Sequence, residues 1–332
     1  MSEILTVLSP YDQSVIEELP MHNSDDVEKC LATAKNLFDH RARWLPKHER
    51  IAILERARVL MQGRREDLTI IAAEEGGKPY VDSLVEVDRA INGLKIAVEE
   101  LANFGGQEIP MALNAASTQR MAFTIKEPIG VAVAVSAFNH PLNLIVHQTV
   151  PAIAVGAPVI VKPALTTPRS CIAFVNLLKE AGLPDGWCEY LLTSNEDSEK
   201  LVTDHRINFF SFIGSAKVGW YLRSKLSPGT RCALEHGGAA PAVIDRTAKV
   251  DDIITPLMKG GFYHSGQVCV SVQRVFAHEE IVDALVQRMI EQVEKLRMGD
   301  PKEEEVDCGP LILPREVDRV EQWVSEAVDE GA

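Results

Sequence analysis

The sequence predicts an α/β protein built around a doubly wound parallel sheet. From about residue 128 onward, short segments rich in apolar and β-branched residues alternate with amphipathic segments of helical length. Segment 131–137 is almost entirely apolar, as expected of a strand buried on both faces of a parallel sheet. Strands and helices that alternate at these lengths are typical of a sheet covered by helices on both sides.

The first hundred residues are expected to be mainly helical. Ser24 is a suitable helix N-cap, and two acids follow it in the first turn. Gly63 predicts a break within the second helical pattern, and Gly77 lies in a predicted helix stop before Lys78. A pair of short strands precedes the helices. The expected elements are strands 4–8 and 14–19 and helices 25–39, 47–75 and 80–103.

The predicted sheet occupies the middle of the chain. Pro168 suits the first turn of a helix, which the glycines near residue 184 then end. The expected strands are 131–137, 157–162, 188–192, 207–213 and 231–235, with helices over 142–154, 168–180, 196–202 and 214–226. A further α/β unit is expected, with strands 242–244 and 272–278 and helices 251–263, 279–296 and 314–329. The extended segment 120–126 is expected to be an edge strand or a strand between subunits.

Ligands of a doubly wound sheet bind outside the carboxyl ends of its strands. Three loops occupy such positions here: 138–141, 162–164 and the Gly214-Ser215 pair. At a strand-to-helix turn, backbone N–H groups and the Ser215 hydroxyl are suited to holding a phosphate. Neither the GxGxxG fingerprint nor a Walker loop is present.

Composition and charge exclude several classes of function. The 34 basic and 48 acidic residues give a net charge of −14, which argues against binding to nucleic acid or to an anionic membrane. The amino terminus lacks the pattern of a signal peptide, and no apolar stretch is long enough to span a bilayer. The six cysteines form no CxxC pair or metal-ligand spacing. We therefore expect a cytoplasmic protein without a structural metal.

Two short stretches suggest covalent chemistry. Cys269 follows a Gly-Gln turn, and Glu235 lies near a Gly-Gly pair. A thiolate is the reactive form of cysteine, and a carboxylate can relay a proton through water. The alternative is that Cys269 is an ordinary packing cysteine.

Six motifs in order make the chain resemble the NAD(P)-dependent aldehyde dehydrogenase superfamily, including its lactaldehyde and semialdehyde members. The acid precedes the cysteine by 34 positions. The motifs lie at residues 127–131, 138–142, 161–163, 212–215, 234–238 and 266–269. The resemblance implies a Rossmann-like cofactor domain, an α/β catalytic domain and a homo-oligomer, either a dimer or a tetramer.

The resemblance also implies roles for individual residues. Cys269 would attack the aldehyde carbon, Asn139 and the Cys269 backbone N–H would hold the oxyanion, and Glu235 would activate the hydrolytic water. NAD or NADP would be the cofactor. Lys162 would hydrogen-bond the adenosine ribose. The remaining cofactor-binding residues would be Ser136, Ala137, Phe138, Leu165, Gly214, Ser215 and Gly237.

The sequence departs from the family pattern at several positions. Leu165 stands where many NAD-preferring relatives carry an acid, so NADP use is expected to be possible, with Arg169 assisting. Ile213 replaces a common threonine. His236 replaces a leucine beside Glu235 and is expected to perturb the protonation of that base. His140, Asn143 and His147 would face the aldehyde tunnel. Such polar side chains favour a small hydroxylated or anionic aldehyde.

The resemblance assigns residues 1–119 and 127–236 to the cofactor domain, 120–126 to the oligomerisation strand and 237–332 to the catalytic domain. Family members are longer, so the catalytic domain is expected to be truncated in this sequence. One alternative is a CoA-acylating enzyme, although these generally lack the acid at Glu235. The other is a catalytically silent protein that binds nucleotide or acts as a structural subunit.

Overall fold

The computed structural model describes residues 3–332. A central sheet of five parallel strands has the order β7-β6-β5-β8-β9. Its strands are β5 (Val131–Val135), β6 (Val159–Lys162), β7 (Cys188–Tyr190), β8 (Ile207–Gly214) and β9 (Arg231–His236). The predicted doubly wound α/β fold is confirmed, and every predicted strand of this sheet is present.

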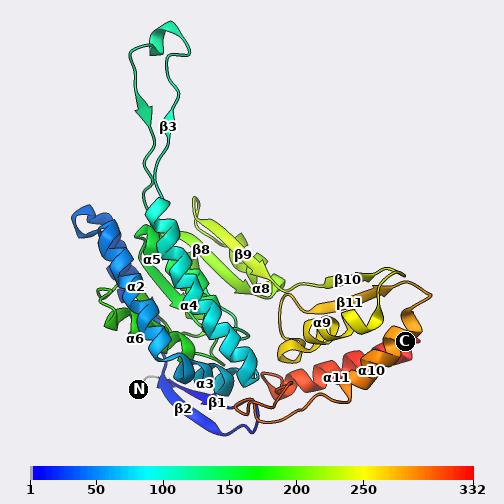
Figure 1. Cartoon of the computed structure of the whole chain (residues 1–332). Helices are drawn as coiled ribbons and strands as arrows, with labels where there is room; N and C mark the ends of the chain where they lie inside the picture. Colours follow the sequence, from blue (N-terminus) through cyan, green and yellow to red (C-terminus); the bar gives the residue numbers. More distant parts are fainter. Residues whose placement is uncertain (1–2) are drawn as a thin grey trace.

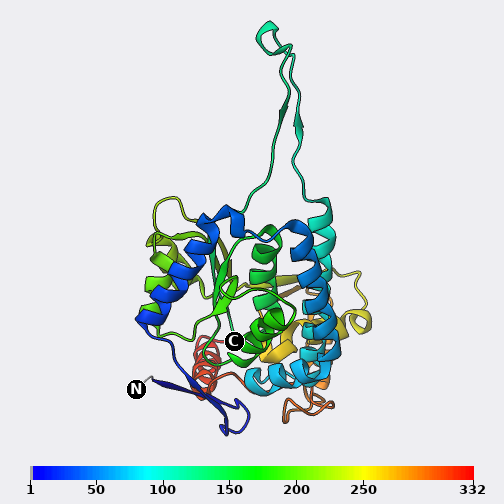
Figure 2. The ribbon, with the colours of Figure 1, turned by 90° about the vertical axis from the view of Figure 1, so that its left-hand side faces the viewer.

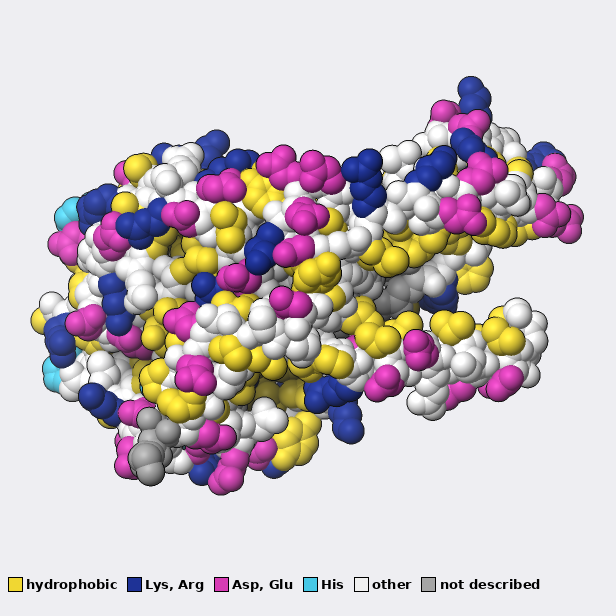
Figure 3. Space-filling view, turned by 90° about the horizontal axis from the view of Figure 1, so that it is seen from below, with side chains coloured by type: hydrophobic (Ala, Val, Ile, Leu, Met, Phe, Trp, Pro, Cys, Tyr) yellow, Lys and Arg dark blue, Asp and Glu magenta, His cyan; other side chains and the backbone are white. Residues whose placement is uncertain are grey.

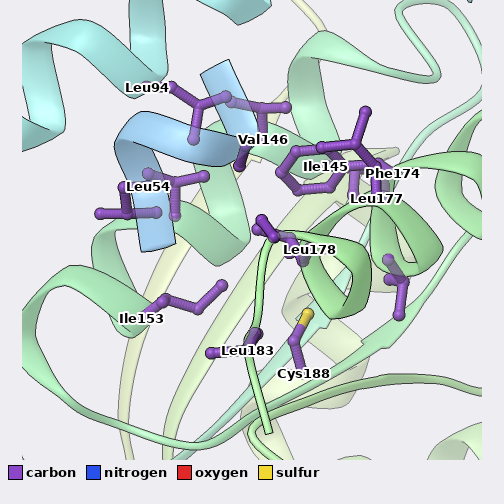
Figure 4. Close-up of a cluster of buried hydrophobic side chains, with 14 of the residues drawn as sticks. Leu54, Leu94, Ile145, Val146, Ile153, Phe174, Leu177, Leu178, Leu183 and Cys188 are labelled. Carbon is purple, nitrogen blue, oxygen red and sulfur yellow. The ribbon is translucent and has the colours of Figure 1, made fainter. Parts of the chain in front are cut away.

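Alternate side chains of β5 enter two different cores. Ala132 and Ala134 face a cluster formed with helices α2 (Lys47–Gly63), α4 (Tyr80–Asn103), α5 (Asn143–Val155) and α6 (Arg169–Glu180), part of which Figure 4 shows. Val131 and Val133 face a second cluster, which helices α1 (Ser24–Asp39), α7 (Asn195–Thr203) and α8 (Ala216–Ser224) cover. Because both faces of the strand are buried, its sequence is apolar at consecutive positions.

Helices cover the sheet on both sides (Figures 1 and 2). Four follow strands of the sheet: α5 (Asn143–Val155), α6 (Arg169–Glu180), α7 (Asn195–Thr203) and α8 (Ala216–Ser224). The others come from the first hundred residues: α1 (Ser24–Asp39), α2 (Lys47–Gly63), α3 (Arg65–Gly76) and α4 (Tyr80–Asn103). The predicted break near Gly63 separates α2 from α3. A two-stranded antiparallel sheet precedes them, made of β1 (Ile4–Leu8) and β2 (Val15–Pro20).

A long hairpin, residues 105–127, projects from the end of α4 (Figures 1 and 2). We call it the arm. The segment predicted as a single strand over 120–126 contains only β4 (Ala122–Phe123), paired with β3 (Glu108–Ile109), which was not predicted. Met121, Phe123 and Ile125 are each at least 70% exposed. These side chains pack against no other layer of the described chain. Because an isolated two-stranded hairpin is only marginally stable, the strand pairing in the arm is short.

The last hundred residues form a smaller unit beside the sheet (Figure 1). It pairs β10 (Ala240–Ile244) in parallel with β11 (Val272–Ala277), and contains α9 (Val250–Phe262), α10 (Val282–Val293) and α11 (Pro314–Asp329). Its core is small, with Ile254, Leu257, Met258 and Leu285 as its buried members. Figure 3 shows hydrophobic side chains gathered on its surface, and α11 buries none of its residues.

Only small differences separate the predicted and observed boundaries of these elements. The helix predicted over 279–296 begins at Val282 and ends at Val293, since a turn follows β11 before the helix starts. Among residues 3–332, no helix has the length and apolar character that crossing a bilayer would require.

Candidate active site

A cleft of about 630 Å³ lies at the carboxyl ends of β5, β6, β8 and β9. This is the edge at which a doubly wound sheet binds its ligands. The loop before β11 forms the wall contributed by the smaller unit. All three predicted catalytic residues line this cleft, as do all eight predicted cofactor-binding residues.

Asn139 lies in the loop that follows β5. Its side-chain Nδ2 donates a hydrogen bond to the backbone carbonyl of Gln267, at 2.9 Å. The amide group carries two hydrogens, so one N–H remains available to a ligand. Its Oδ1 is buried and has no partner among the described residues. The loops of Asn139 and the cysteine are therefore in direct contact.

Cys269 and Glu235 are both exposed to the cleft. Gly238 brings their two segments together, because a Cβ atom at this position would lie 2.4 Å from the Cys269 carbonyl oxygen. Only glycine permits so close an approach of two backbones. The loop that follows β9 therefore packs against the cysteine loop.

The loop leading to Cys269 has an unusual backbone. His264 and Ser265 have positive φ angles of 49° and 54°, in the left-handed region that few residues other than glycine occupy. Contacts to a distant loop hold this conformation. The Ser265 hydroxyl donates to the Gly309 carbonyl at 2.6 Å, and the Ile312 N–H donates to the Gln267 side chain at 2.9 Å. Such strain is common at functional sites.

Lys162 ends β6, and its side chain is buried where it meets the cleft. Burial lowers the pKa of its amine to about 8. Ser215 is the N-cap of α8, and its hydroxyl accepts a hydrogen bond from the Val218 N–H. A buried amine, a helix N-terminus and a strand end thus meet in a cleft whose dimensions suit a nucleotide.

Comparison with known proteins decides what this cleft belongs to. The family model described as "Aldehyde dehydrogenase family" matches residues 1–332. The chain belongs to the aldehyde dehydrogenase family. It is 37% identical, over its whole length, to 3-sulfolactaldehyde dehydrogenase of Priestia aryabhattai, and covers 69% of that protein. It is 32% identical to lactaldehyde dehydrogenase of Methanocaldococcus jannaschii, over 99% of this chain and 70% of that protein.

Solved structures of the family have the same fold. Aldehyde dehydrogenase 21 from Physcomitrella patens, in complex with succinate, matches with a TM-score of 0.94 and 33% identity, over 99% of this chain and 69% of that one. Glyceraldehyde-3-phosphate dehydrogenase from M. jannaschii, in complex with NADP, matches with a TM-score of 0.93 and 31% identity, over 100% and 72%. The resemblance predicted from the six motifs is confirmed.

The three predicted substrate-lining residues are not brought together. His140 lines the cleft, where its Nε2 lies 3.3 Å from the Tyr263 hydroxyl. Asn143 is buried behind the cleft, and its Oδ1 has no partner among the described residues. His147 is exposed in a separate apolar groove between α4 and α5. His140 precedes the first residue of α5, so the helical spacing that would place it on one face with Asn143 and His147 does not apply to it.

Two other departures from the family pattern have structural roles. Arg169, expected to assist with a 2′-phosphate, forms ion pairs with Glu17 at 3.0 Å and Glu74 at 2.5 Å and does not line the cleft. His236 packs its ring against Trp220, at 5.3 Å between ring centroids. His236 lines the cleft beside Glu235 and at the same time contacts α8 through Trp220.

Several residues of the cleft were not predicted from the sequence. Asn195, Gln273, Thr166 and Val218 line it, and Gln267 binds Asn139. Asn195 begins α7 directly after β7, so the rule that ligands bind at strand ends would have found it. No local pattern distinguishes Gln273, which reaches the cleft only because β11 pairs with β10.

Proposed function

We propose that this chain oxidises an aldehyde to a carboxylic acid with NAD or NADP. The observation that carries the proposal is the convergence of Asn139, Glu235 and Cys269 on one cleft. Three residues from distant parts of the sequence supply the nucleophile, the oxyanion donor and the base that thioester chemistry needs.

In the proposed reaction, the Cys269 thiolate adds to the aldehyde carbon to form a thiohemiacetal. The free N–H of Asn139 and the backbone N–H of Cys269 bind the oxygen as it becomes negative. A bound nicotinamide would accept the hydride that leaves the thiohemiacetal carbon. Glu235 then takes a proton from the water that attacks the resulting thioester, which releases the acid and regenerates the thiol.

The cleft supports binding of either nucleotide. Leu165 presents no carboxylate that would repel a 2′-phosphate, and the ammonium of Lys162 favours anions. The family includes D-glyceraldehyde dehydrogenase (NADP+) of Thermoplasma acidophilum, which is 30% identical over 98% of this chain and covers 65% of that protein. We propose that NADP is accepted as well as NAD.

We propose a small polar or anionic aldehyde as the substrate. The similar 3-sulfolactaldehyde and lactaldehyde dehydrogenases support this class. Arg89 on α4 is exposed, and its positive charge acts on His140, which lines the cleft. Burial and the charges of Lys78 and Arg89 lower the pKa of His140 to about 2, so this imidazole is neutral at physiological pH.

The test follows NAD(P)H formation by the purified chain, with lactaldehyde and hexanal compared in the absence of CoA. We expect turnover that favours lactaldehyde and that Cys269→Ser abolishes. Glu235→Gln should still release one NAD(P)H per site and then turn over about 100- to 10,000-fold more slowly, since it lacks the base for hydrolysis. A requirement for CoA, or no NAD(P)H from the folded chain, would contradict the proposal.

A further inference from the structure

A buried ion pair lies directly behind the Asn139 loop. The side chains of Lys78, after α3, and Glu86, on α4, form a salt bridge and are both fully inaccessible to solvent. Burying two charges costs free energy that a salt bridge alone repays poorly, unless additional hydrogen bonds satisfy the remaining groups. In this chain, those additional bonds go to the active-site loop.

Glu86 caps the helix that follows Asn139. While Oε2 accepts from Lys78, Oε1 accepts from the backbone N–H groups of Leu142 and Asn143, each at 2.9 Å. Leu142 is the N-cap of α5 and supplies no side-chain acceptor of its own. A carboxylate from another helix therefore satisfies the free N–H groups and the positive end of the α5 dipole.

Lys78 holds the other end of the same short segment. Its Nζ donates to the backbone carbonyl of Asn139, at 3.3 Å. The ion pair thus contacts Asn139 through Lys78 and residues 142–143 through Glu86. With both ends of the loop bound to one buried unit, the direction in which the Asn139 amide points is restricted.

Gly77, just before Lys78, packs against the loop that holds Gln267, the hydrogen-bond partner of the Asn139 amide. A Cβ atom at Gly77 would lie 3.0 Å from the Pro310 ring, and one at Gly309 would lie 1.9 Å from the Gly77 carbonyl oxygen. The loop that begins there holds Gln267 through the Ile312 N–H. Gln267 in turn accepts the Asn139 hydrogen bond. Segment 77–86 therefore contacts both the Asn139 loop and the loop that holds Gln267, the two partners of the hydrogen bond from the Asn139 amide.

We propose that Lys78 and Glu86 are positioning residues, which aim the Asn139 amide at the oxyanion formed on Cys269. The proposal rests on the proposed function, because it assigns Asn139 the role of oxyanion donor. Neither residue lines the cleft, so both act through Asn139. A group that serves only as a helix cap would affect stability without a specific link to Asn139.

The experiment uses a reaction that needs neither cofactor nor hydride transfer. p-Nitrophenyl acetate acylates a thiolate: sulfur bonds to the acetyl carbon, the ester C–O bond breaks, and p-nitrophenolate leaves. Its tetrahedral intermediate carries the same kind of oxyanion. The rate of nitrophenolate release is measured for the full chain, with Cys269→Ser as the background.

Two matched variants separate the effect of the hydrogen-bond acceptor at Glu86 from the effect of the buried charges. Lys78→Met/Glu86→Gln and Lys78→Met/Glu86→Leu both avoid an unpaired buried charge, and only the first retains an acceptor for the two N–H groups. We expect the leucine variant to acylate about 10- to 100-fold more slowly than the glutamine variant, since a small misplacement of a catalytic group has effects of that size. Asp88→Asn, which removes an exposed carboxylate of α4 paired with Arg65, should leave the rate unchanged.

The acylation rates of the glutamine and leucine variants are then measured again with Asn139→Ala added to each. We expect the two rates to agree within about twofold, because residues that act through one group are not additive. If the glutamine and leucine variants differed in rate by the same factor with Asn139 and with Asn139→Ala, the proposal would be overturned. It would also be overturned if Asn139→Ala by itself did not slow acylation. If the leucine variant does not fold, hydrogen exchange over 138–143 is compared between wild type and the glutamine variant. Unchanged exchange there would contradict a tether through Lys78.

The outcomes distinguish this proposal from the proposed function. An acylation rate that follows the expected pattern without any NAD(P)H formation would leave the positioning role intact and reject the dehydrogenase. NAD(P)H formation together with additive acylation effects would reject the positioning role alone.

Discussion

Lys162 is a buried side chain to which we assign a role in the proposed choice between NAD and NADP. It ends an apolar strand, so its amine lies beneath the cleft surface with little access to solvent. Burial penalises the charged form and lowers the pKa from 10.5 to about 8. The amine is therefore mainly charged below pH 8 and mainly neutral above it.

This titration predicts a pH effect that differs between the two cofactors. Between pH 7 and pH 9, NADP affinity should fall by up to about 10-fold, since the protonated fraction of Lys162 falls by about that factor. NAD affinity should fall less, because the ammonium pairs with no 2′-phosphate in that complex. Fluorescence titrations at both pH values measure the two affinities. Lys162→Met should remove the difference, and equal pH slopes in the wild type would refute it.

The three residues to which we assign the proposed chemistry were expected in the site from the sequence, whereas several of their neighbours were not. Cys269, Glu235 and Asn139 stand in short motifs that their chemistry explains, and all three line the cleft. His140 lies before α5 begins, so the helical spacing that links it to Asn143 and His147 does not apply, and His147 lies in another groove. His236 does line the cleft, and its ring also packs against Trp220 of α8.

At the scale of elements, helices α5 and α6 share an arrangement at their amino ends. Neither Leu142 nor Pro168, their N-caps, provides a side-chain cap. Carboxylates from other helices act instead: Glu86 at α5, and Glu75 of α3 at α6. Glu75 accepts from the N–H groups of Arg169 and Ser170, at 2.7 and 2.8 Å. The helical first hundred residues thus support the helices that begin at the cleft.

Glu75 predicts a specific pH dependence of stability. Burial raises its pKa from 4.5 to about 7, so the folded chain binds this proton more tightly than the unfolded chain does. The wild type should therefore lose stability as pH rises from about 4.5 to 7. Glu75→Gln has no such titration and should gain on the order of 3 kcal/mol relative to wild type over that interval.

Urea unfolding at pH 5 and pH 8 measures this difference. Glu180→Gln, which removes an exposed carboxylate of α6 paired with Arg64, is the control and should show the wild-type profile. Parallel profiles for wild type and Glu75→Gln would show that Glu75 does not titrate in this range.

At the scale of the whole molecule, the arm is the feature with least support from the rest of the chain. Its two short strands leave both edges unpaired, and Phe123 and Ile125 are 70% and 71% exposed. Exposed apolar strand edges are templates for pairing with another chain. We propose that the arm mediates self-association.

Substitution in the arm tests this proposal. Phe123→Ser/Ile125→Ser should weaken self-association by about 10-fold or more, as loss of buried apolar anchors does in other interfaces. Sedimentation equilibrium over a concentration series gives the dissociation constants. Val59→Ser changes a similarly exposed apolar residue on α2 and should have no effect. A wild-type chain that stays monomeric, or a variant that associates as the wild type does, would contradict the role of the arm.

The sequence by itself determined the parallel sheet and most of the order of helices and strands, and its motifs pointed to Cys269, Glu235 and Asn139. The helices and strands follow from apolar periodicity and capping residues in neighbouring positions, whereas the three residues follow from motifs shared with the family. Only the tertiary structure decided that Lys78 and Glu86 lie behind Asn139, that His147 lies outside the cleft, and that the arm projects as a hairpin. These features depend on contacts between segments far apart in sequence and on the rotation of each element, which no local pattern specifies.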